Sequence, residues 1–379
     1  MIPVSKPSTG PEELVAIGEV LRSGWLGLGA KTLEFEEAVK NYIGCQHVAA
    51  VNSGTSALHL ALDAFGIGLG DEVIVPSITF VASIQAILAT GAIPIFCESC
   101  EENLLMDIGD VKRKITRRTK ALMPVHYGGN PCDMDTLLAL AKEHGFWVVE
   151  DAAHAFGSTY KGRRVGSFGH ATCFSFDPIK NITCGEGGAV AVQDEAIAEK
   201  LRRKRVLGID KNAWQRHQNT QSWFYEVTEQ GYRYHMPNFC AAIGLVQMKK
   251  VDKFIRRRRE ICRLYHAAFS DLKTIKTLSA DYDEVAPHIY IARISDGRRD
   301  QFMNFLKARG VDTSVHYIAN HIHPAFKKYV REPLPKAAQL WQEIVTLPLY
   351  YEMNESDIRT VIDAVLAFED SFFPLLERK

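Results

Sequence analysis

One lysine, Lys180, stands between an apolar, strand-like run and a cluster of glycines in the stretch FSFDPIKNITCGEGG, residues 174–188. A lysine drawn into a pocket shifts its pKa readily, and its neutral amine attacks carbonyl groups, so the position suits Schiff-base chemistry. Ser175 precedes it on the same strand-to-loop connection and could hold a phosphate. A solvated lysine in a turn is the ordinary alternative, and this stretch alone would favour it.

An acidic residue, Asp151, ends the apolar run FWVVED. A carboxylate is costly to bury at the end of a strand unless it meets a cation. A protonated heterocyclic nitrogen would be such a cation, whereas a helix cap or a salt bridge would be a purely structural use. The residue pattern leaves both open.

Small residues follow another apolar run, HVAAV, in the stretch NSGTS at 52–56, which opens a helix-like segment. Free backbone N–H groups, the helix dipole and hydroxyl side chains make such a start an anion site, although an ordinary N-cap uses the same residues. The glycines at 185–188 indicate either a tight turn or backbone that passes close to another group.

One ligand would use all of these features together. Pyridoxal 5′-phosphate (PLP) needs a lysine for its aldehyde, a carboxylate for its ring nitrogen and a small-residue helix start for its phosphate. It also needs a flat group over its ring, and Phe80, in SITF, is available at a further strand end. The combination therefore predicts a PLP site with Lys180 and Asp151 as its reactive pair.

The elements that must position these residues alternate between strand and helix from about 46 to 192. Continuous apolar runs separated by helix-length segments indicate strands buried on both faces, hence a mostly parallel, doubly wound α/β sheet. Ligands of such sheets bind at the carboxyl ends of the strands. We expect a large domain over residues 1–245, whose N-terminal segment helps to cover the cleft. A smaller α+β domain should occupy 246–379, with a long basic helix over roughly 239–269 and further helix up to Phe372.

The bulk properties exclude several other classes of protein. Lys and Arg together number 45, as do Asp and Glu, so the formal net charge is zero and nothing draws the chain as a whole to nucleic acid or to a membrane. We expect a cytoplasmic protein, because no signal peptide or spanning segment is evident. The eight cysteines do not suggest a disulfide scaffold, and the pair Cys97 and Cys100 lacks two further zinc ligands at suitable spacing, so no metal is expected. The run Arg256–Arg259 is expected to be a solvated helix face.

The order and spacing of longer segments resemble the sugar aminotransferases of the DegT/DnrJ/StrS type, which are fold-type I PLP enzymes. The resemblance runs from SGW at 23–25 through NSGTSALHLAL, GDEVIVPSITFVAS, PVHYGG, VVEDAAHAFGS and FSFDPIKNITCGEGG to RGVDTSVHY near the C-terminus. It is strongest with the subgroup that aminates 4-keto sugars on nucleotide carriers.

By position, the resemblance implies a role for each matching residue. Lys180 would carry the cofactor, Asp151 would pair with its ring nitrogen and Phe80 would stack on its ring. The remaining cofactor contacts would be Gly54, Thr55 and Ser175 at the phosphate and His154 near the ring oxygen. Trp25, His316 and Tyr317 would contact the sugar, with a core role as an equal alternative for Trp25.

The family also implies a homodimer in which each subunit completes the other's site. The phosphate ligand from the neighbouring subunit is often the asparagine of a Tyr-Asn-Tyr-Arg segment, and here that stretch is YRYH at 232–235. Arg233 is our first choice for this ligand, because a guanidinium pairs well with phosphate, and His235 is the alternative.

The activity implied is transfer of an amino group from an amino acid, expected to be L-glutamate, to a keto sugar. The expected acceptor is a nucleotide-linked 4-keto-6-deoxy sugar or a related keto sugar. Two alternatives within the same scaffold are a PLP-dependent sugar dehydratase and a regulator without enzymatic activity. Dehydratases of the family have histidine at the lysine position, so Lys180 argues against the first.

Overall fold

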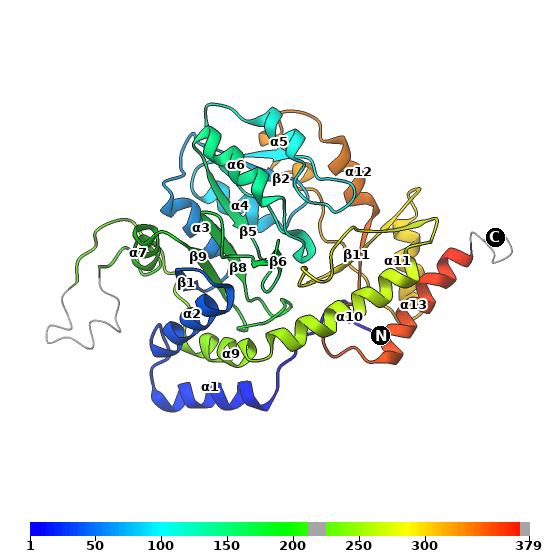
Figure 1. Ribbon diagram of the computed structural model, residues 1–379, viewed down its shortest axis with the longest axis horizontal. Helices are drawn as coiled ribbons and strands as arrows, with labels where there is room; N and C mark the ends of the chain where they lie inside the picture. The colour runs from blue at the N-terminus through cyan, green and yellow to red at the C-terminus, as the bar shows by residue number, and fades with distance from the viewer. Residues whose placement is uncertain (211–224, 372–379) are drawn as a thin grey trace.

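The computed structural model describes residues 1–210 and 225–371. A seven-stranded sheet forms its centre (Figure 1). Six of the strands run parallel to one another, and β9 runs antiparallel to both of its neighbours. In spatial order the strands are β1 (His47–Val51), β9 (Gly188–Val192), β8 (Ala171–Ser175), β5 (Trp147–Asp151), β4 (Thr119–Leu122), β2 (Glu72–Pro76) and β3 (Ile93–Cys97). The mostly parallel α/β class is confirmed, and the apolar runs HVAAV and FWVVED supply β1 and β5.

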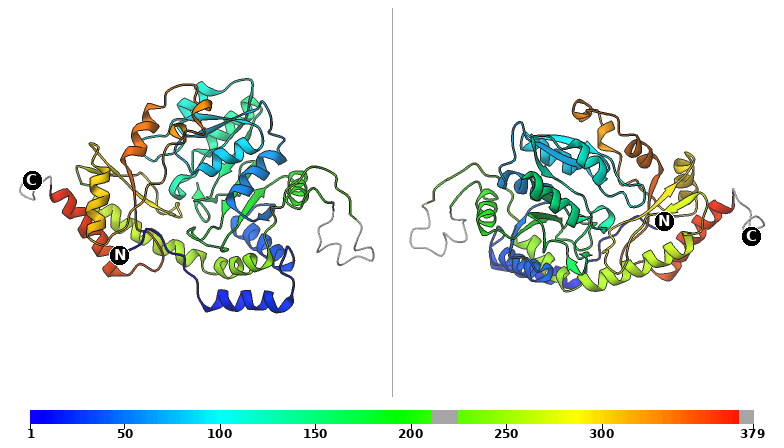
Figure 2. Two further views of the ribbon diagram at one scale, coloured as in Figure 1. Left: turned by 180° about the vertical axis from the view of Figure 1, so that it is seen from behind. Right: turned by 45° about the horizontal axis from the view of Figure 1, so that its top comes forward.

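Helices cover both faces of this sheet, so that nearly all strand residues are buried (Figure 2). α3 (Gly54–Ala64) and α4 (Val81–Ala89) pack against each other and against the sheet, while α5 (Ile108–Lys114) and α6 (Met134–His144) pack on β3, β4 and β5. α7 (Glu195–Lys204) lies beside α3 and β1. Continuous apolar strands require this two-sided cover.

The C-terminal part has a smaller antiparallel sheet of β10 (Ile275–Thr277), β11 (Tyr290–Ile294) and β12 (Ile344–Leu347). Together with α10 (Val251–Phe269), α11 (Arg299–Ala308) and α13 (Glu355–Asp370) it encloses a second apolar core. The predicted long helix is two helices, α9 (Asn238–Met248) and α10, and the predicted run of helix towards the C-terminus is interrupted by β12. Phe372 lies outside the described residues.

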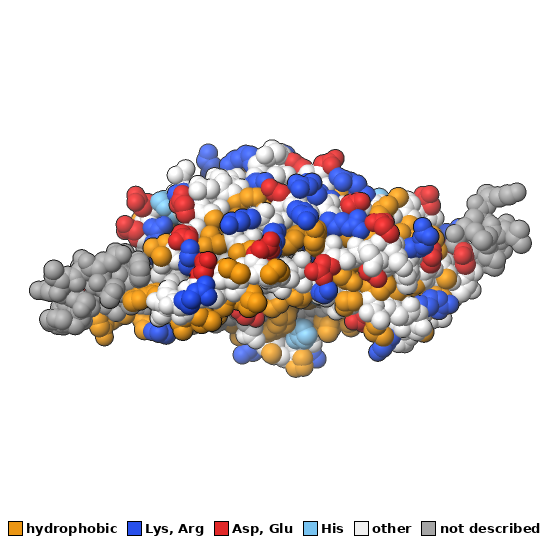
Figure 3. All heavy atoms as spheres, turned by 90° about the horizontal axis from the view of Figure 1, so that it is seen from below, with side chains coloured by type: hydrophobic (Ala, Val, Ile, Leu, Met, Phe, Trp, Pro, Cys, Tyr) orange, Lys and Arg blue, Asp and Glu red, His pale blue; other side chains and the backbone are white. Residues whose placement is uncertain are grey.

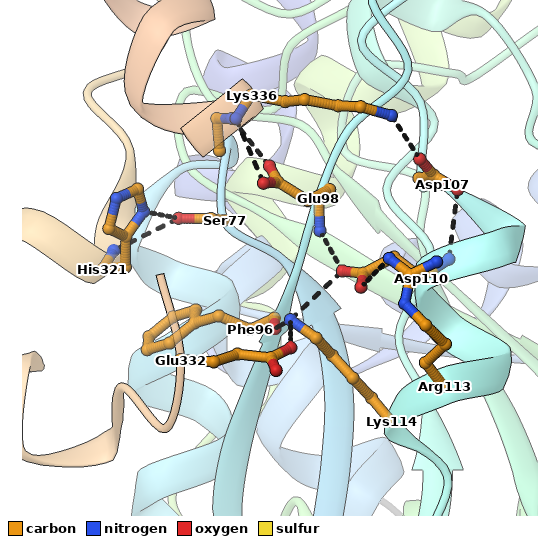
Figure 4. A network of polar contacts seen from close by, with 11 residues as sticks. Ser77, Phe96, Glu98, Asp107, Asp110, Arg113, Lys114, His321, Glu332 and Lys336 are labelled. Carbon is orange, nitrogen blue, oxygen red and sulfur yellow. Dashed lines mark hydrogen bonds and ion pairs between the residues drawn. The ribbon is translucent and has the colours of Figure 1, made fainter. Parts of the chain in front are cut away.

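A segment that follows β11 and α11 packs back on the large sheet. Phe326, Leu334 and Leu340 join the larger core cluster, and polar contacts hold α12 (Pro335–Glu343) beside β3 and α5 (Figure 4). The Glu98 carboxylate accepts the N–H groups of Lys336 and Ala337 at 3.1 and 2.7 Å. If the chain is divided at residue 245 as proposed, this later segment of the C-terminal part nevertheless packs with the large domain.

The basic run Arg256–Arg259 is a solvated face only in part, because Arg256 is exposed and Arg257 is half-buried, whereas Arg258 and Arg259 turn inward. Arg258 is buried, with 3% of its surface exposed, and its Nη1 donates to the carbonyl oxygens of His288 and Leu349, both at 3.1 Å. Arg259 donates to the carbonyl oxygen of Val285 at 2.8 Å. These arginines face inward because α10 lies between loops whose carbonyl groups need donors.

The N-terminal residues form α1 (Pro11–Ser23) and α2 (Ala30–Ile43), and both helices pack on α9. The first residues then reach the C-terminal part, where Ile2 forms a bridge with Val311. Within the described residues, no helix combines the length and the apolar character needed to cross a membrane.

Candidate active site

A cavity of about 230 Å³ lies at the carboxyl ends of β5 and β8 and at the starts of α3 and α4. This is the edge at which doubly wound sheets bind ligands. The cavity gathers nine of the predicted site residues: Gly54, Thr55, Phe80, Asp151, His154, Ser175, Lys180, His316 and Tyr317.

Lys180 reaches the cavity from a turn that follows β8. Its backbone N–H donates to the carbonyl oxygen of Asp177 at 3.1 Å, which closes this turn. Burial lowers the pKa of the Lys180 amine, and the nearby Asp177 and Asp151 carboxylates oppose that shift. A lysine with a lowered pKa supplies more of the neutral, nucleophilic amine near pH 7.

Asp151 is the last residue of β5 and is almost fully buried. Ser83 donates its hydroxyl to Oδ2 at 2.6 Å, and the backbone N–H of Ala153 donates to Oδ1 at 3.2 Å. Burial raises the pKa of the carboxyl, while the hydrogen bond from Ser83 lowers it. Among the described residues no cation forms an ion pair with Asp151, so a protonated ring nitrogen in the cavity would supply the missing charge.

The start of α3 serves as a helix cap and also presents donors to the cavity. Ser53 caps the helix by accepting the backbone N–H of Ser56 at 3.1 Å, which is the ordinary use of such a serine. A Cβ added at Gly54 would lie 2.9 Å from the Ser175 Cβ, so only glycine allows α3 to start this close to β8. The exposed Thr55 and the Ser175 hydroxyl line the same cavity and can hold an anion at the helix N-terminus.

The glycines after Lys180 serve mainly the close approach of backbone. At Gly188 an added Cβ would lie 2.3 Å from the carbonyl oxygen of Ser53, so β9 passes directly beside the start of α3. Gly185 has a positive φ of 78°, which favours glycine in the turn. Both of the uses that the sequence left open therefore occur.

His154 and Tyr317 are linked by a hydrogen bond whose direction follows from the backbone. The His154 Nδ1 accepts the N–H of Gly128 at 3.3 Å, so its proton lies on Nε2 and is donated to the Tyr317 hydroxyl oxygen at 2.9 Å. The Phe80 ring is 53% exposed and lies 5.4 Å from the Tyr317 ring, measured between centroids. An aromatic face is thus open to a planar ligand.

His316 lies at the same edge of the cavity and is held by the small domain. Its Nδ1 lies 2.7 Å from the Thr346 hydroxyl of β12. Burial and the nearby Lys180 lower the pKa of His316 to about 4. The ring is therefore neutral at pH 7 and can accept or donate a hydrogen bond to a sugar hydroxyl.

Two predicted residues lie elsewhere in the subunit. Trp25 and Arg233 line a second cavity of about 340 Å³, together with His235. The Trp25 Nε1 donates to the carbonyl oxygen of Leu28 at 2.9 Å. Within one subunit neither residue lines the cavity of Lys180, and no residue of the N-terminal segment up to Lys40 does so.

Sequence reasoning missed several residues around the reactive pair. Ser83 lies inside a helix and His288 precedes a strand. Ser83 ends the quoted segment GDEVIVPSITFVAS, which carries the predicted Phe80, whereas no quoted motif contains His288. Asp177 and Glu186 also line the cavity. They lie within the quoted lysine stretch, so their nearness to the site could have been inferred from their position.

These observations fit PLP. One cavity is surrounded by a buried carboxylate that has no ion-pair partner among the described residues, a lysine with a lowered pKa, an exposed aromatic face and a helix N-terminus narrowed by Gly54. Each matches one part of the cofactor: ring nitrogen, aldehyde, ring face and phosphate.

Comparisons with known proteins agree with this assignment. The sequence profile of the DegT/DnrJ/EryC1/StrS aminotransferase family matches residues 7–366. The spore coat polysaccharide biosynthesis protein SpsC of Bacillus subtilis (strain 168) is 42% identical over 373 residues, which cover 96% of each chain.

Solved structures of sugar aminotransferases are also similar throughout. DesV of S. venezuelae is 36% identical with a TM-score of 0.88, over 95% of this chain and 94% of that one. PseC of Helicobacter pylori, an aminotransferase involved in the biosynthesis of pseudoaminic acid, is 28% identical with a TM-score of 0.90, over 98% and 100%. A Streptococcus pneumoniae protein in a PLP form is 29% identical with a TM-score of 0.90, over 98% of this chain and 99% of that one.

Proposed function

Because the chain belongs to the DegT/DnrJ/EryC1/StrS aminotransferase family and is a PLP-dependent sugar aminotransferase, we propose that it aminates a nucleotide-linked keto sugar. The proposed acceptor is a 4-keto-6-deoxy sugar or a related keto sugar, and the proposed donor is L-glutamate. The observation that carries the proposal is the placement of Lys180 and Asp151 in one cavity beside an exposed aromatic face.

The residues of the cavity divide the work of holding the cofactor. Gly54, Thr55 and Ser175 would bind the phosphate, Phe80 would stack on the ring and His154 would lie near the ring oxygen. Asp151 would keep the ring nitrogen protonated, because an anion beside that nitrogen raises its pKa. When bound, PLP supplies an electron sink for the reaction at the amine-bearing carbon.

Lys180 has two tasks in this scheme. Its amine would hold the cofactor through the aldehyde, and when free it would act as the base that takes the proton from the donor α-carbon. The lowered pKa favours the neutral amine that both tasks need. The same amine would return a proton to the sugar carbon that becomes aminated.

The relatives support an amino-sugar product used in a polysaccharide. SpsC is named for spore coat polysaccharide biosynthesis and PseC for pseudoaminic acid. His316 and Tyr317 are proposed to contact the sugar, and the exposed Thr55 and Phe80 mark the open side of the cavity, where a nucleotide carrier would extend. We assign this activity to the cytoplasm, where nucleotide sugars would meet it.

We further propose a homodimer in which each subunit completes the other's site, with Arg233 as the phosphate ligand that reaches the neighbouring site. Arg233 lies away from Lys180 of its own subunit, as a residue that serves the neighbouring site would. His235 remains the alternative phosphate ligand, and Trp25 is proposed to contact the sugar from the same surface.

The proposal is tested with enzyme that has first been converted to its pyridoxamine phosphate form. Keto sugars on different nucleotide carriers are added, and return of the visible absorbance of PLP reports amino transfer. We expect conversion with a nucleotide-linked 4-keto sugar at a rate at least about tenfold above that with simple 2-oxo acids of unrelated structure. Equal rates with all carbonyl compounds would contradict the substrate assignment.

Replacement of Lys180 distinguishes the chemistry from the scaffold. Lys180→Ala is expected to abolish transfer and the visible absorbance of bound PLP, because the amine that binds the aldehyde is gone. Lys161→Ala, at an exposed lysine in the turn of a short β-hairpin, is the matched control. It should leave amino transfer and the absorbance of bound PLP unchanged. Retained transfer in Lys180→Ala would show that another residue performs the reaction.

A further inference from the structure

His288 lies directly behind Lys180, although it belongs to the loop before β11. Its Nε2 lies 3.4 Å from the Lys180 Nζ, and only 3% of its surface is exposed. It does not line the cavity itself, so it can act on the site only through the residues that it contacts. Its ring also packs on that of His154, with 4.4 Å between the centroids.

The backbone around His288 is held from both sides. Its N–H donates to the carbonyl oxygen of Gly128 at 3.1 Å, and its carbonyl oxygen accepts the Arg258 Nη1 at 3.1 Å. Arg258 is buried, and among the described residues it forms no ion pair with a carboxylate. Burying a charge lowers the free energy of unfolding unless the charge is well hydrogen-bonded. Here the Arg258 guanidinium holds this loop and the Leu349 carbonyl beside it.

The surroundings keep the His288 ring neutral. Among the described residues, the nearby groups that lower its pKa together with burial are Lys180, His154, Arg258 and His316. Burial and these neighbours lower the pKa of His288 well below its ordinary value. A neutral imidazole has one nitrogen that accepts a hydrogen bond, whereas a lysine ammonium only donates.

The hydrogen bond therefore has a defined direction when Lys180 is charged. Nε2 accepts, and the ring proton lies on Nδ1, which is buried and has no partner among the described residues. A buried polar atom without a partner lowers stability. Among the described residues, the contact with the Lys180 Nζ is the one side-chain hydrogen bond of the His288 ring.

We propose that His288 is a positioning residue, which holds the Lys180 ammonium through a hydrogen bond to its Nε2 whenever the lysine is not bonded to the cofactor. The inference rests on the proposed function, since that function requires Lys180 to stay in place while it moves protons. The hydrogen bond favours the charged amine, so His288 opposes the lowering of the Lys180 pKa by burial.

The test measures Lys180 in the protein without cofactor. The rate at which acetic anhydride labels Lys180 is followed against pH by mass spectrometry of the peptide that contains it, which yields the pKa of the amine. His288→Met removes the acceptor at nearly constant volume, and His288→Gln retains an acceptor oxygen near the position of Nε2. His266→Met is the control, because His266 also has a buried Nδ1 without a partner but lies at the far end of α10.

We expect His288→Met to lower the pKa of Lys180 by about one unit, as expected for loss of a hydrogen bond to a charged group. His288→Gln should restore at least half of this shift, and His266→Met should match the wild type. Equal values in His288→Met and His288→Gln, or no shift in His288→Met, would overturn the proposal. If His288→Met does not fold, as judged by circular dichroism, His288→Asn replaces it, because the shorter amide does not reach Nζ.

The outcome is independent of the proposed substrate. Labelling uses neither sugar nor amino donor, so a wrong sugar assignment would leave the predicted shift intact. Conversely, an unchanged Lys180 in His288→Met would leave the amino-transfer test valid.

Discussion

At the scale of one residue, the buried Asp151 carboxylate lowers the stability of the protein when no cofactor is bound. Its carboxyl is buried, no described cation pairs with it, and two hydrogen bonds from Ser83 and Ala153 only partly replace water. Burial raises its pKa above the ordinary value. The folded protein therefore binds this proton more tightly than the unfolded chain does, and a bound ring cation would remove the penalty.

The pH dependence of stability follows from this sign. The free energy of unfolding falls as pH rises from the ordinary pKa of aspartate through the raised value, and the loss is complete above it. Asp151→Asn should therefore raise the melting temperature of the cofactor-free protein at pH 7.5 by about 2 °C. The gain should shrink as pH is lowered towards 4, and amino transfer should fall by at least about 100-fold because the ring nitrogen loses its anion.

Calorimetry at several pH values checks this expectation. Asp271→Asn, at an exposed aspartate, is the control and should change stability little at any pH. A variant Asp151→Asn that is less stable than the wild type at every pH would show that the carboxylate is stabilising.

At the scale of elements, the contacts between α12, β3 and α5 hold the segment that follows His316 and Tyr317. Glu98, next to β3, is nearly buried and accepts two N–H groups from the first turn of α12. A carboxylate at a helix N-terminus is favoured by the free donors and by the helix dipole. Ser77 follows β2, and its hydroxyl oxygen lies 2.7 Å from the His321 Nδ1, which holds the segment at a second point (Figure 4).

We expect Glu98→Ala to lower the free energy of unfolding by about 1–3 kcal/mol, because the buried N–H of Ala337 and the partly buried N–H of Lys336 lose their acceptor. Urea unfolding measures the change, and limited proteolysis should show new cleavage between residues 319 and 343. Lys336→Ala removes only the more exposed ion pair with Asp107, at 3.1 Å, from the same network. It should cost less than about 1 kcal/mol, and an equal loss in both variants would refute the capping role of Glu98.

At the scale of the whole molecule, the surface suits contact with a second copy of the chain better than contact with a polyanion. Charged side chains of both signs alternate with apolar ones on the face that carries α1 (Figure 3), and the formal net charge is zero. Large apolar side chains are exposed along the N-terminal segment, namely Leu14, Val15, Leu21, Leu26 and Leu33. Such exposure favours burial against another subunit, in line with the proposed homodimer.

Mixed dimers test whether Arg233 serves the partner's site. Lys180→Ala and Arg233→Ala should each give low activity alone. Refolding equal amounts together makes about half of the dimers mixed. If the two residues come from different subunits, one of the two sites in each mixed dimer is intact, so about a quarter of the wild-type activity should return. Lys180→Ala mixed with Asp151→Asn is the control, because both residues belong to the site of their own subunit. Every site of that mixed dimer keeps one defect, so recovered activity there would contradict shared sites of the kind proposed.

Much of this architecture was determined by the sequence alone, because it depends on local pattern. Each strand of the large sheet is an apolar run, and a run buried on both faces must lie inside a helix-covered sheet. Lys180, Asp151 and the NSGTS segment follow strands, and strand ends of a parallel sheet meet at one edge, so their gathering could be predicted. The seven strands are apolar runs of this kind. Six of the predicted residues that line the cavity follow from strand ends, namely Gly54, Thr55, Phe80, Asp151, Ser175 and Lys180, whereas His154, His316 and Tyr317 were implied by the family resemblance.

Only the tertiary structure decided the rest, because it depends on contacts between distant positions. His288 reaches Lys180 across 108 positions, and Ser83 reaches Asp151 across 68. Arg258 looked like part of a solvated charge run, yet it is buried because carbonyl groups of two distant loops need its donors. Trp25 and Arg233 lie at a separate cavity. Which side chain faces inward, and which groups shift its pKa, is set by packing between elements that no local pattern records.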